Sequence, residues 1–329
     1  MLAGARGMRL ARRFRVRWSF RGASRVFAVD IGSHSVKVVA ARHHGASVCV
    51  EAAVVGALPA GAIHGHVVRD PAPVADVLRR LVREVGMRSR RAVTALPGPA
   101  VMMRRIAVEP RPCGGLDALV VREAAALVPE ALEHVVLDYQ VVGSFGADGT
   151  SSVLVVAARR DLVQGYTAAI RAAGLEPCGI EVDVFALDRL HRAGLNGGGA
   201  PAPVALVHVG ARRADVTLAR SDGPIFASDV PVGGAELDPG SLSCAIHRAL
   251  DLCVSDAPAP LAGLVLSGGA ARAPGLATAL GRRLGCSVAV ADPFRSVALG
   301  PRVDVDVLAR IAPTFAIAMG LALRGPGTT

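Results

Sequence analysis

The chain is organised around the stretch Val26-Phe27-Ala28-Val29-Asp30-Ile31-Gly32-Ser33-His34-Ser35-Val36-Lys37-Val38-Val39. Its pattern predicts a strand, a tight turn at Gly32 and a returning strand, because β-favouring residues flank an Asp-x-Gly-Ser corner. Glycine adopts backbone angles that a side chain forbids, so this corner is expected to turn amide N–H groups toward an anion.

Three side chains of this hairpin have chemistry suited to phosphate. Ser33 supplies a hydroxyl donor, Lys37 a cation, and Asp30 a carboxylate that can hold Mg²⁺ through a bound water. Lys37 is the only lysine in 329 residues. An ammonium retained at this single position favours a phosphate-binding hairpin, although an ordinary hairpin with a glycine corner is the alternative.

The motif Asp-Ile-Gly-Ser-x-x-x-Lys resembles the first phosphate loop of the superfamily that contains actin, sugar kinases and heat-shock chaperones. About residues 26–325 resemble the PilM family of actin-like type IV pilus assembly proteins. Thr94-Ala95-Leu96 and Val135-Val136-Leu137-Asp138-Tyr139 resemble the insert shared by PilM and the cell-division protein FtsA. The resemblance implies an α/β, bilobed actin-like (ribonuclease H-like) fold with an inserted α+β subdomain.

Seven segments are expected along the chain. They are a basic, disordered leader (1–25), a first lobe with the phosphate hairpin (26–99), an inserted strand–helix–strand–strand–helix subdomain (100–172), a return to the first lobe (173–193), a Gly/Pro hinge (194–203), a second lobe (204–310) and a closing helix (311–325). In the closing helix, Gly320 is expected to permit close packing between the lobes.

Composition limits the class of protein. The net charge is +10, but residues 1–25 hold eight arginines and no acid, which leaves about +2 (10 − 8) for the rest. This leader has no secretory signal pattern, and either meets anionic lipid or is functionally silent. No nucleic-acid partner is expected. Six scattered cysteines without a Cys-x-x-Cys pair indicate reduced thiols.

No membrane span is expected near the end of the chain. The apolar stretch Ile311–Leu323 has about 13 residues and contains Pro313, whereas a spanning helix needs about 20. A soluble protein is therefore expected.

The second lobe repeats the pattern of the first. An apolar strand from Val204 reaches a corner at Gly210, and a strand returns from Asp215. Gly268-Gly269 resembles the adenosine loop of the superfamily, where backbone would approach a planar base. The nucleotide-binding residues that the resemblance implies are Asp30, Gly32, Ser33, Lys37, Gly210, Gly268 and Gly269, with Mg²⁺ near Asp30.

Three departures from the family pattern argue against hydrolysis. His208 stands where the second phosphate loop carries Asp, and Ala214 where it carries a hydroxyl; His208 is expected to be a strand residue satisfied by a backbone bond. A Glu-x-x-Lys helix for adenine cannot exist without a second lysine, so the helical subdomain of the second lobe is reduced. Asp183 is only a weak candidate for a general base, with Glu181 on the same face, and both are expected to be solvated or structural.

The resemblance implies a cytoplasmic scaffold at the inner face of the inner membrane, in the pilus assembly platform, that binds the N-terminal cytoplasmic segment of PilN. ATP and Mg²⁺ are implied ligands, with negligible hydrolysis. The partner groove is expected beside the insert strands Val101–Val108 and Ser152–Ala157, next to the first lobe. The residues expected to line it are Val101, Met102, Met103, Arg104 and Arg105.

Two alternatives belong to other classes. A small-molecule kinase of the same superfamily would need an acidic base and a substrate cleft. An FtsA-like filament protein would carry a C-terminal amphipathic membrane helix, and this sequence stops at Arg324-Gly-Pro-Gly-Thr-Thr.

Overall fold

A computed structural model describes residues 24–45, 47–109, 115–145, 150–195, 203–220, 223–230, 238–253 and 261–324. Most of the basic leader and of the predicted Gly/Pro hinge lies outside these ranges, so both assignments stay predictions. The chain folds into two compact units. The smaller contains Val101–Val163 and the larger is built from the segments on either side of it.

The first sheet of the larger unit has the strand order β10-β6-β1-β2-β3-β16. Its antiparallel meander consists of β1 (Ser24–Ile31), β2 (Ser35–His44) and β3 (Ser47–Ala57), which confirms the predicted hairpin. Strand β6 (Arg91–Leu96) runs parallel to β1, and β10 (Glu176–Val182) runs parallel to β6. The short β16 (Ala298–Leu299) pairs with β3 from the other end of the sequence, which the sequence did not reveal.

Helix α1 (Pro71–Val85) shows how local sequence sets an element. The Asp70 carboxylate accepts from the Ala72 amide at 2.9 Å, and Gly86, at φ 65°, ends the helix in the left-handed conformation. Val74, Leu78, Leu81 and Val85 are buried along one stripe, and α1 packs on β2 and β3. The small hairpin β4 (Ile63–His64) and β5 (Val67–Val68) precedes this helix.

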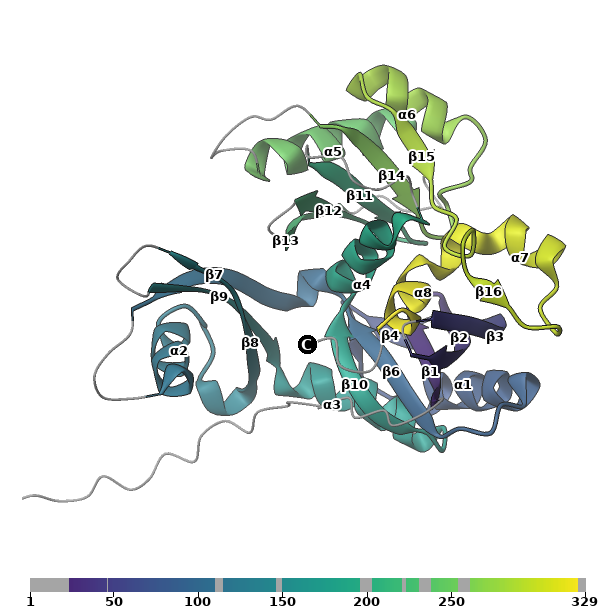
Figure 1. The fold of residues 1–329 in the computed structure, drawn as a ribbon, viewed down its shortest axis with the longest axis horizontal. Coiled ribbons are helices and arrows are strands. Elements are labelled where there is room, and N and C mark those ends of the chain that lie inside the picture. The colour runs from purple at the N-terminus through teal and green to yellow at the C-terminus, as the bar shows by residue number, and fades with distance from the viewer. Residues whose placement is uncertain are drawn as a thin grey trace, which may run out of the picture. The chain divides into compact units, whose positions relative to one another are not determined.

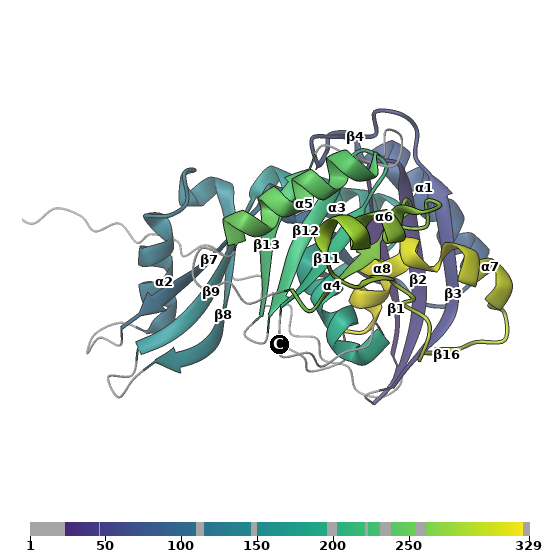
Figure 2. The same ribbon diagram turned by 90° about the horizontal axis from the view of Figure 1, so that it is seen from above.

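The second sheet of the larger unit has the order β13-β12-β11-β14-β15. Its strands are β11 (Val204–Val209), β12 (Ala214–Arg220), β13 (Gly223–Val230), β14 (Gly263–Ser267) and β15 (Val288–Val290). The β11–β12 hairpin with parallel β14 repeats the β1–β2 hairpin with parallel β6. Helix α5 (Pro239–Cys253) lies across β12 and β13 (Figure 2), and α6 (Leu276–Leu284) packs beside α5.

Helices α4 (Asp183–Leu190) and α8 (Ala316–Ala322) pack against each other between the two sheets (Figure 1). Gly320 makes this contact possible, because a Cβ there would lie 2.0 Å from the Ala186 carbonyl oxygen. Close packing at Gly320 was predicted from sequence. It joins α8 to α4, a helix that the short η3 turn (His191–Leu195) extends.

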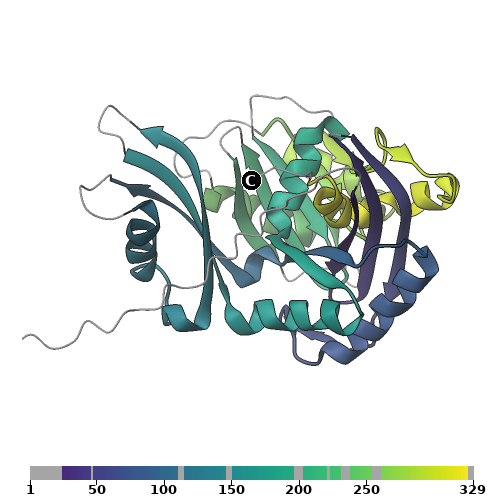
Figure 3. The same cartoon turned by 60° about the horizontal axis from the view of Figure 1, so that its bottom comes forward.

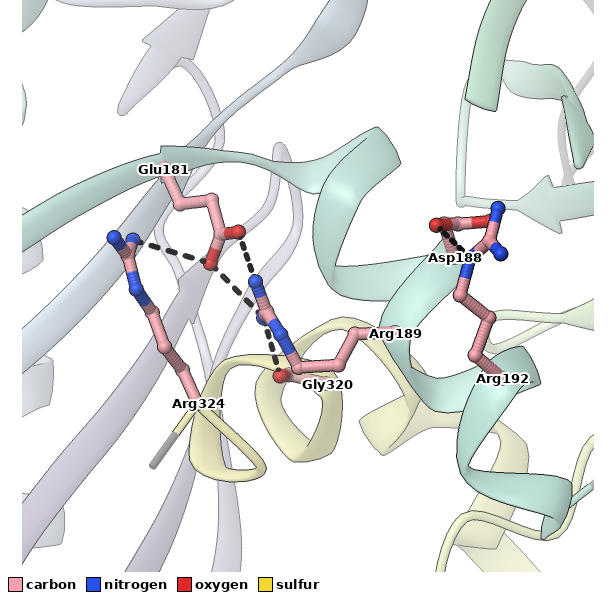
Figure 4. A network of polar contacts seen from close by, with 6 residues as sticks. All are labelled: Glu181, Asp188, Arg189, Arg192, Gly320 and Arg324. Carbon is pink, nitrogen blue, oxygen red and sulfur yellow. Dashed lines mark hydrogen bonds and ion pairs between the residues drawn. The ribbon is translucent and has the colours of Figure 1, made fainter. Parts of the chain in front are cut away.

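A network of ion pairs and hydrogen bonds also stabilises the contact between α4 and α8 (Figure 4). The buried Glu181 carboxylate pairs with the guanidinium of Arg189 on α4 and lies 3.7 Å from that of Arg324. Arg189 also donates to the Gly320 carbonyl at 2.8 Å. Glu181 therefore has a structural role and is not solvated.

The closing helical run is longer than predicted. Helix α7 (Val305–Ile311), η4 (Ala312–Phe315) and α8 follow one another without a gap, and Asp304 caps the start of α7 by accepting from the Val307 amide at 2.9 Å. This run of 18 residues, Val305–Ala322, meets the length and hydropathy of a membrane span, but 61% of it is buried inside the fold. Its α8 part packs on β1, β2 and β6 as a core helix.

The smaller unit is a three-stranded antiparallel sheet of order β7-β9-β8 with α2 (Leu116–Ala125) packed on one face (Figure 3). Its strands are β7 (Val101–Val108), β8 (Val135–Phe145) and β9 (Thr150–Arg159), and η2 (Leu132–His134) precedes β8. The unit ends inside α3 (Arg160–Ala172), while η1 (Gly98–Ala100) precedes β7 in the larger unit. Strand β9 is central, so of the two strands expected beside the partner groove, only Val101–Val108 lies at an edge of the sheet.

Substitution of Gly320 by Ala tests the α4–α8 contact. The new Cβ overlaps the Ala186 carbonyl, so the free energy of unfolding should fall by about 3 kcal/mol despite the better helix propensity of alanine. Urea unfolding measures this change. Gly281→Ala in α6 is the matched control, because its nearest atom is 3.3 Å away, and a loss equal to that of Gly320→Ala would contradict the packing argument.

Candidate functional site

The first hairpin brings Asp30 and Lys37 together by its register. They are direct cross-strand partners on β1 and β2, so their side chains project from the same face. The Lys37 ammonium lies 3.1 Å from the Asp30 carboxylate, and both side chains are about nine-tenths buried. An ammonium and a carboxylate thus neutralise each other at the carboxyl end of β1.

Gly32 acts differently from the prediction. Its φ is not in the left-handed region, and its amide donates to the Ser35 carbonyl at 3.1 Å, closing the turn instead of facing an anion. A Cβ on Gly32 would lie 2.8 Å from the Lys37 ammonium. The glycine therefore makes room for the lysine head group, while Ser33 beside it is exposed.

The second hairpin places His208 between two polar neighbours. His208 is the cross-strand partner of Asp215 on β12 and of Ser267 on β14. Its Nδ1 forms a 3.0 Å hydrogen bond with the Ser267 hydroxyl, so the expectation of a backbone bond is wrong. Ala214, next to Asp215, is fully buried and adds no polar group.

The His208 imidazole is held neutral. Its pKa is lowered to about 4, chiefly by burial; the Asp30 carboxylate opposes this effect, and the nearby Lys37 ammonium adds to it. The electrostatic influence of these residues shows that the two hairpins face a common interior. A neutral imidazole therefore occupies the position where the resemblance in sequence implies a carboxylate.

Asp183 is buried at the first position of α4. Its Oδ1 accepts from the Gly98 amide at 2.9 Å. Burial raises the pKa of this carboxyl well above its usual range, and the charge of Asp215 raises it further. Asp183 is therefore not solvated. Its carboxyl group is influenced by the charges of Asp215 and, more weakly, of Asp30, and both raise its pKa.

Sequence reasoning missed two residues of this cluster. Asp215 could have been found, because hairpin pairing across Gly210 sets it opposite His208. Tyr166 could not, because on α3 it shares the apolar stripe of the core. Burial raises its pKa, as do the charges of Asp30 and Asp183, and its hydroxyl donates to the His66 carbonyl at 3.1 Å.

The two glycines after β14 do not behave alike. Gly268 has φ 92°, and a Cβ on it would lie 2.3 Å from the Val209 carbonyl oxygen. Its missing side chain therefore serves backbone packing, where the sequence suggested approach to a base. Gly269 is exposed with open space around it, and the Gly210 amide closes the β11–β12 turn on the Arg213 carbonyl at 2.9 Å.

The site fits one side of a magnesium nucleotide better than the other. The first hairpin offers an ammonium, an exposed hydroxyl and a carboxylate, which suit phosphate and hydrated Mg²⁺. The second offers a neutral imidazole already bonded to Ser267. Within the described ranges no group of three His, Cys, Asp or Glu side chains is placed to hold a metal ion directly.

The residues predicted for partner binding lie together on β7, at one edge of the small sheet. Val101 is buried, Met102 and Met103 are half-buried, and Arg104 and Arg105 are exposed. Met102 packs beside Val128, Val135 and Ala157.

Two hairpin sheets that face each other across paired helices, with acidic and basic groups at the hairpin turns, define an actin-like protein. The family model described as "Type IV pilus assembly protein PilM" matches residues 28–243 and 237–326. The chain belongs to this PilM family.

Solved structures agree with this assignment. The chain is similar to one described as "PilM-PilN type IV pilus biogenesis complex", at 27% identity and a TM-score of 0.79, covering 92% of this chain and 99% of that one. It also resembles the ethanolamine utilization protein EutJ from Carboxydothermus hydrogenoformans, at 15% identity and a TM-score of 0.50, covering 94% and 92%. The second likeness shows the fold alone.

His208 predicts a specific dependence of stability on pH. Between pH 6.5 and about 4 the unfolded chain takes up a proton on residue 208 that the folded chain does not, so acidification should cost about 3 kcal/mol. His208→Asn should remove this part of the slope in urea unfolding. Asp183 contributes with the opposite sign, since its raised pKa makes stability fall as pH rises above the unfolded value.

The control is His44→Asn, at an exposed position on β2. It should leave the slope unchanged. Equal slopes in His208→Asn and the parent protein would contradict the neutral, buried imidazole.

Proposed function

We propose that this protein is a cytoplasmic scaffold of the type IV pilus assembly platform, at the inner face of the inner membrane, and that it binds the N-terminal cytoplasmic segment of a PilN-like protein. The observation that carries this proposal is the similarity, over 92% of the chain, to a chain of the structure described as "PilM-PilN type IV pilus biogenesis complex". Membership of the PilM family supports it independently.

The two edges of the small sheet differ in how far their own unit covers them. On β8, Arg160 donates to the Val135 carbonyl at 3.0 Å, and the Asp138 carboxylate accepts from the Tyr139 amide at 2.9 Å. Backbone groups of alternate residues in an antiparallel strand point the same way, so these contacts occupy the outer side of β8. The edge at β7 is therefore the better site for an added strand.

Strand β7 also has side chains suited to a peptide. Met103 is half-buried and adaptable, and the exposed Arg104 and Arg105 can meet a carboxylate or a peptide carbonyl. An extended peptide that adds to this edge gains main-chain hydrogen bonds, with alternate side chains setting specificity. Met102, which packs beside Val128, Val135 and Ala157, would support the strand from the core side, and the buried Val101 would support it from the other face.

Titration with the N-terminal cytoplasmic peptide of the PilN homologue tests this site. Met103→Glu should weaken binding at least about tenfold, equivalent to about 1.4 kcal/mol, because it places a charge where an apolar contact forms. Val142→Glu, on the exposed end of β8, is the matched control and should leave affinity unchanged. Unchanged affinity in Met103→Glu, or equal losses in both variants, would place the peptide elsewhere.

We also propose that the first hairpin retains nucleotide binding without turnover, on the observation that Lys37 and Asp30 are held together beside an exposed Ser33. Lys37 and Ser33 would hold phosphate oxygens, and Asp30 would hold Mg²⁺ through water. Gly269, which is exposed with open space around it, is the glycine that could lie along the nucleotide. Phosphoryl transfer needs charge stabilisation on both sides of the nucleotide, and the neutral His208 does not provide it on the second side.

Thermal melting with Mg-ATP tests this second proposal. At a hundred times the dissociation constant the ligand adds about 2.7 kcal/mol, which should raise the melting midpoint by several degrees. Asp30→Asn combined with Lys37→Met removes both charges without leaving one buried alone, and should abolish the rise.

Phosphate release should stay negligible in the parent protein. No thermal shift at millimolar Mg-ATP would refute nucleotide binding. Steady turnover that Asp183→Asn abolishes would favour the small-molecule kinase.

A further inference from the structure

The outer side of β3, away from β2, is only partly covered. Strand β16 pairs with it at Cys49 and Val50 alone, and within the described ranges no strand lies beside residues 52–57 on this side. After β16 the Gly300 amide donates to the Val50 carbonyl at 2.8 Å, and the Val303 amide closes a turn on the Gly300 carbonyl at 3.1 Å. A strand with unpaired backbone groups on one side can accept another strand. We call residues 52–57 the β3 edge.

The hydrogen bonds around β3 show which backbone groups point outward. The Leu58 amide donates to the His34 carbonyl at 2.8 Å, so it points toward the turn between β1 and β2. Backbone groups alternate in direction along an antiparallel strand, which turns those of Ala53, Val55 and Ala57 outward. No described residue forms a hydrogen bond with these outward groups.

These outward groups suit a second copy of the same strand. With a two-fold axis at Val55, antiparallel pairing sets Val55 opposite Val55 and Ala53 opposite Ala57 of the other copy, so every outward N–H and C=O gains a partner. No residue of the β3 edge is charged. Strand β7 is unsuited to such self-pairing, because pairing about its middle would set arginines 104 and 105 against each other.

Helix α1 borders one face of the β3 edge, since it packs on β2 and β3. A Cβ on Gly56 would lie 2.9 Å from the Val77 side chain and 3.2 Å from the Arg80 guanidinium, so both side chains reach this margin. Glu84 follows Arg80 by four residues on the same side of the helix. Arg80 and Glu84 are exposed, and neither forms an ion pair with another described residue.

The two-fold axis would bring these charges together between copies. Strands lie about 4.8 Å apart and α1 covers β2 and β3, so the two α1 helices would be antiparallel and about 10 Å apart, a usual packing distance. The Arg80 guanidinium of each copy can then reach the Glu84 carboxylate of the other.

The opposite face of this margin is apolar. Val55 projects away from α1, because its neighbour Gly56 faces the helix, and it is 42% exposed. Helix α7 lies at the same margin beside β16 (Figures 1 and 2), and its Val305 and Val307 are 58% and 44% exposed. In the described part of the larger unit, the only other large apolar side chain this exposed is Val290. Apolar side chains gathered at one margin favour a protein interface.

We propose that the β3 edge, with α1 on one face and α7 on the other, binds a second copy of this chain about a two-fold axis at Val55. The first sheets of the two copies would join into one continuous sheet. An extended peptide of another protein could make the same backbone bonds, but it would leave the Arg80 and Glu84 charges unmatched. This association does not depend on which partner β7 receives or on nucleotide.

Sedimentation velocity of the full chain between about 1 and 100 μM tests this proposal, and a dimer should appear as the concentration rises. Val55→Lys should weaken the dimer at least about tenfold, because the axis sets the two lysines against each other. Val290→Lys, at an exposed position on β15, is the matched control and should leave the dimer unchanged.

Charge reversal tests the contact between the α1 helices. Arg80→Glu and Glu84→Arg should each weaken the dimer, because each sets like charges against each other across the axis. The double variant should restore it. A peptide of another protein would show no such rescue.

Three results would overturn the proposal: a chain that stays monomeric throughout this range, a dimer that Val55→Lys leaves intact, or a double reversal that fails to restore the dimer. Urea unfolding of the variants should match that of the parent protein, because every substituted side chain is exposed. Titrations with the PilN peptide and with Mg-ATP should be unaffected by Val55→Lys, so the proposals fail independently.

Discussion

The contact of α8 with α4 is the constraint on which the rest of the larger unit depends. It exists because Gly320 lets one backbone approach the Ala186 carbonyl, and Arg189 fixes it by bridging Glu181 and the Gly320 carbonyl. Since α4 starts at Asp183, the same contact sets where the buried carboxyl lies relative to Asp30. Packing between helices therefore determines the electrostatics between hairpins.

The fold was largely predictable because its signals are local. The β1–β2 corner, the apolar stripe of α1 and the glycine that ends it follow from period and turn chemistry within about fifteen residues. The pairing of β16 with β3 was not predictable, because two residues carry no pattern and their partner lies about 250 positions earlier. The central position of β9 was missed for a related reason, since strand order depends on tertiary packing.

Only part of the candidate site could be predicted from the sequence. Asp30 and Lys37 could be identified from the sequence motif, and they lie on the paired strands β1 and β2 as predicted. The groups that alter the chemistry of the site do so through burial: burial keeps His208 neutral, and burial raises the pKa of Asp183. The type of a residue does not reveal how deeply it is buried. A glycine in the sequence likewise does not reveal which neighbouring atom lies where its side chain would be: the Lys37 ammonium at Gly32 and the Val209 carbonyl at Gly268.

The pairing of β16 with β3 and the packing of α8 on β1, β2 and β6 have a consequence for the folding of the chain during its synthesis. Strands β1, β2 and β3 of the first sheet are encoded before residue 58, whereas the outer strand β16 and the covering helix α8 are encoded only after residue 297. Until residue 322 emerges, one face of β1 and β2 stays without its cover. The nascent chain must therefore hold an apolar surface while the intervening residues are synthesised, which exposes it to aggregation and makes it a substrate for chaperones.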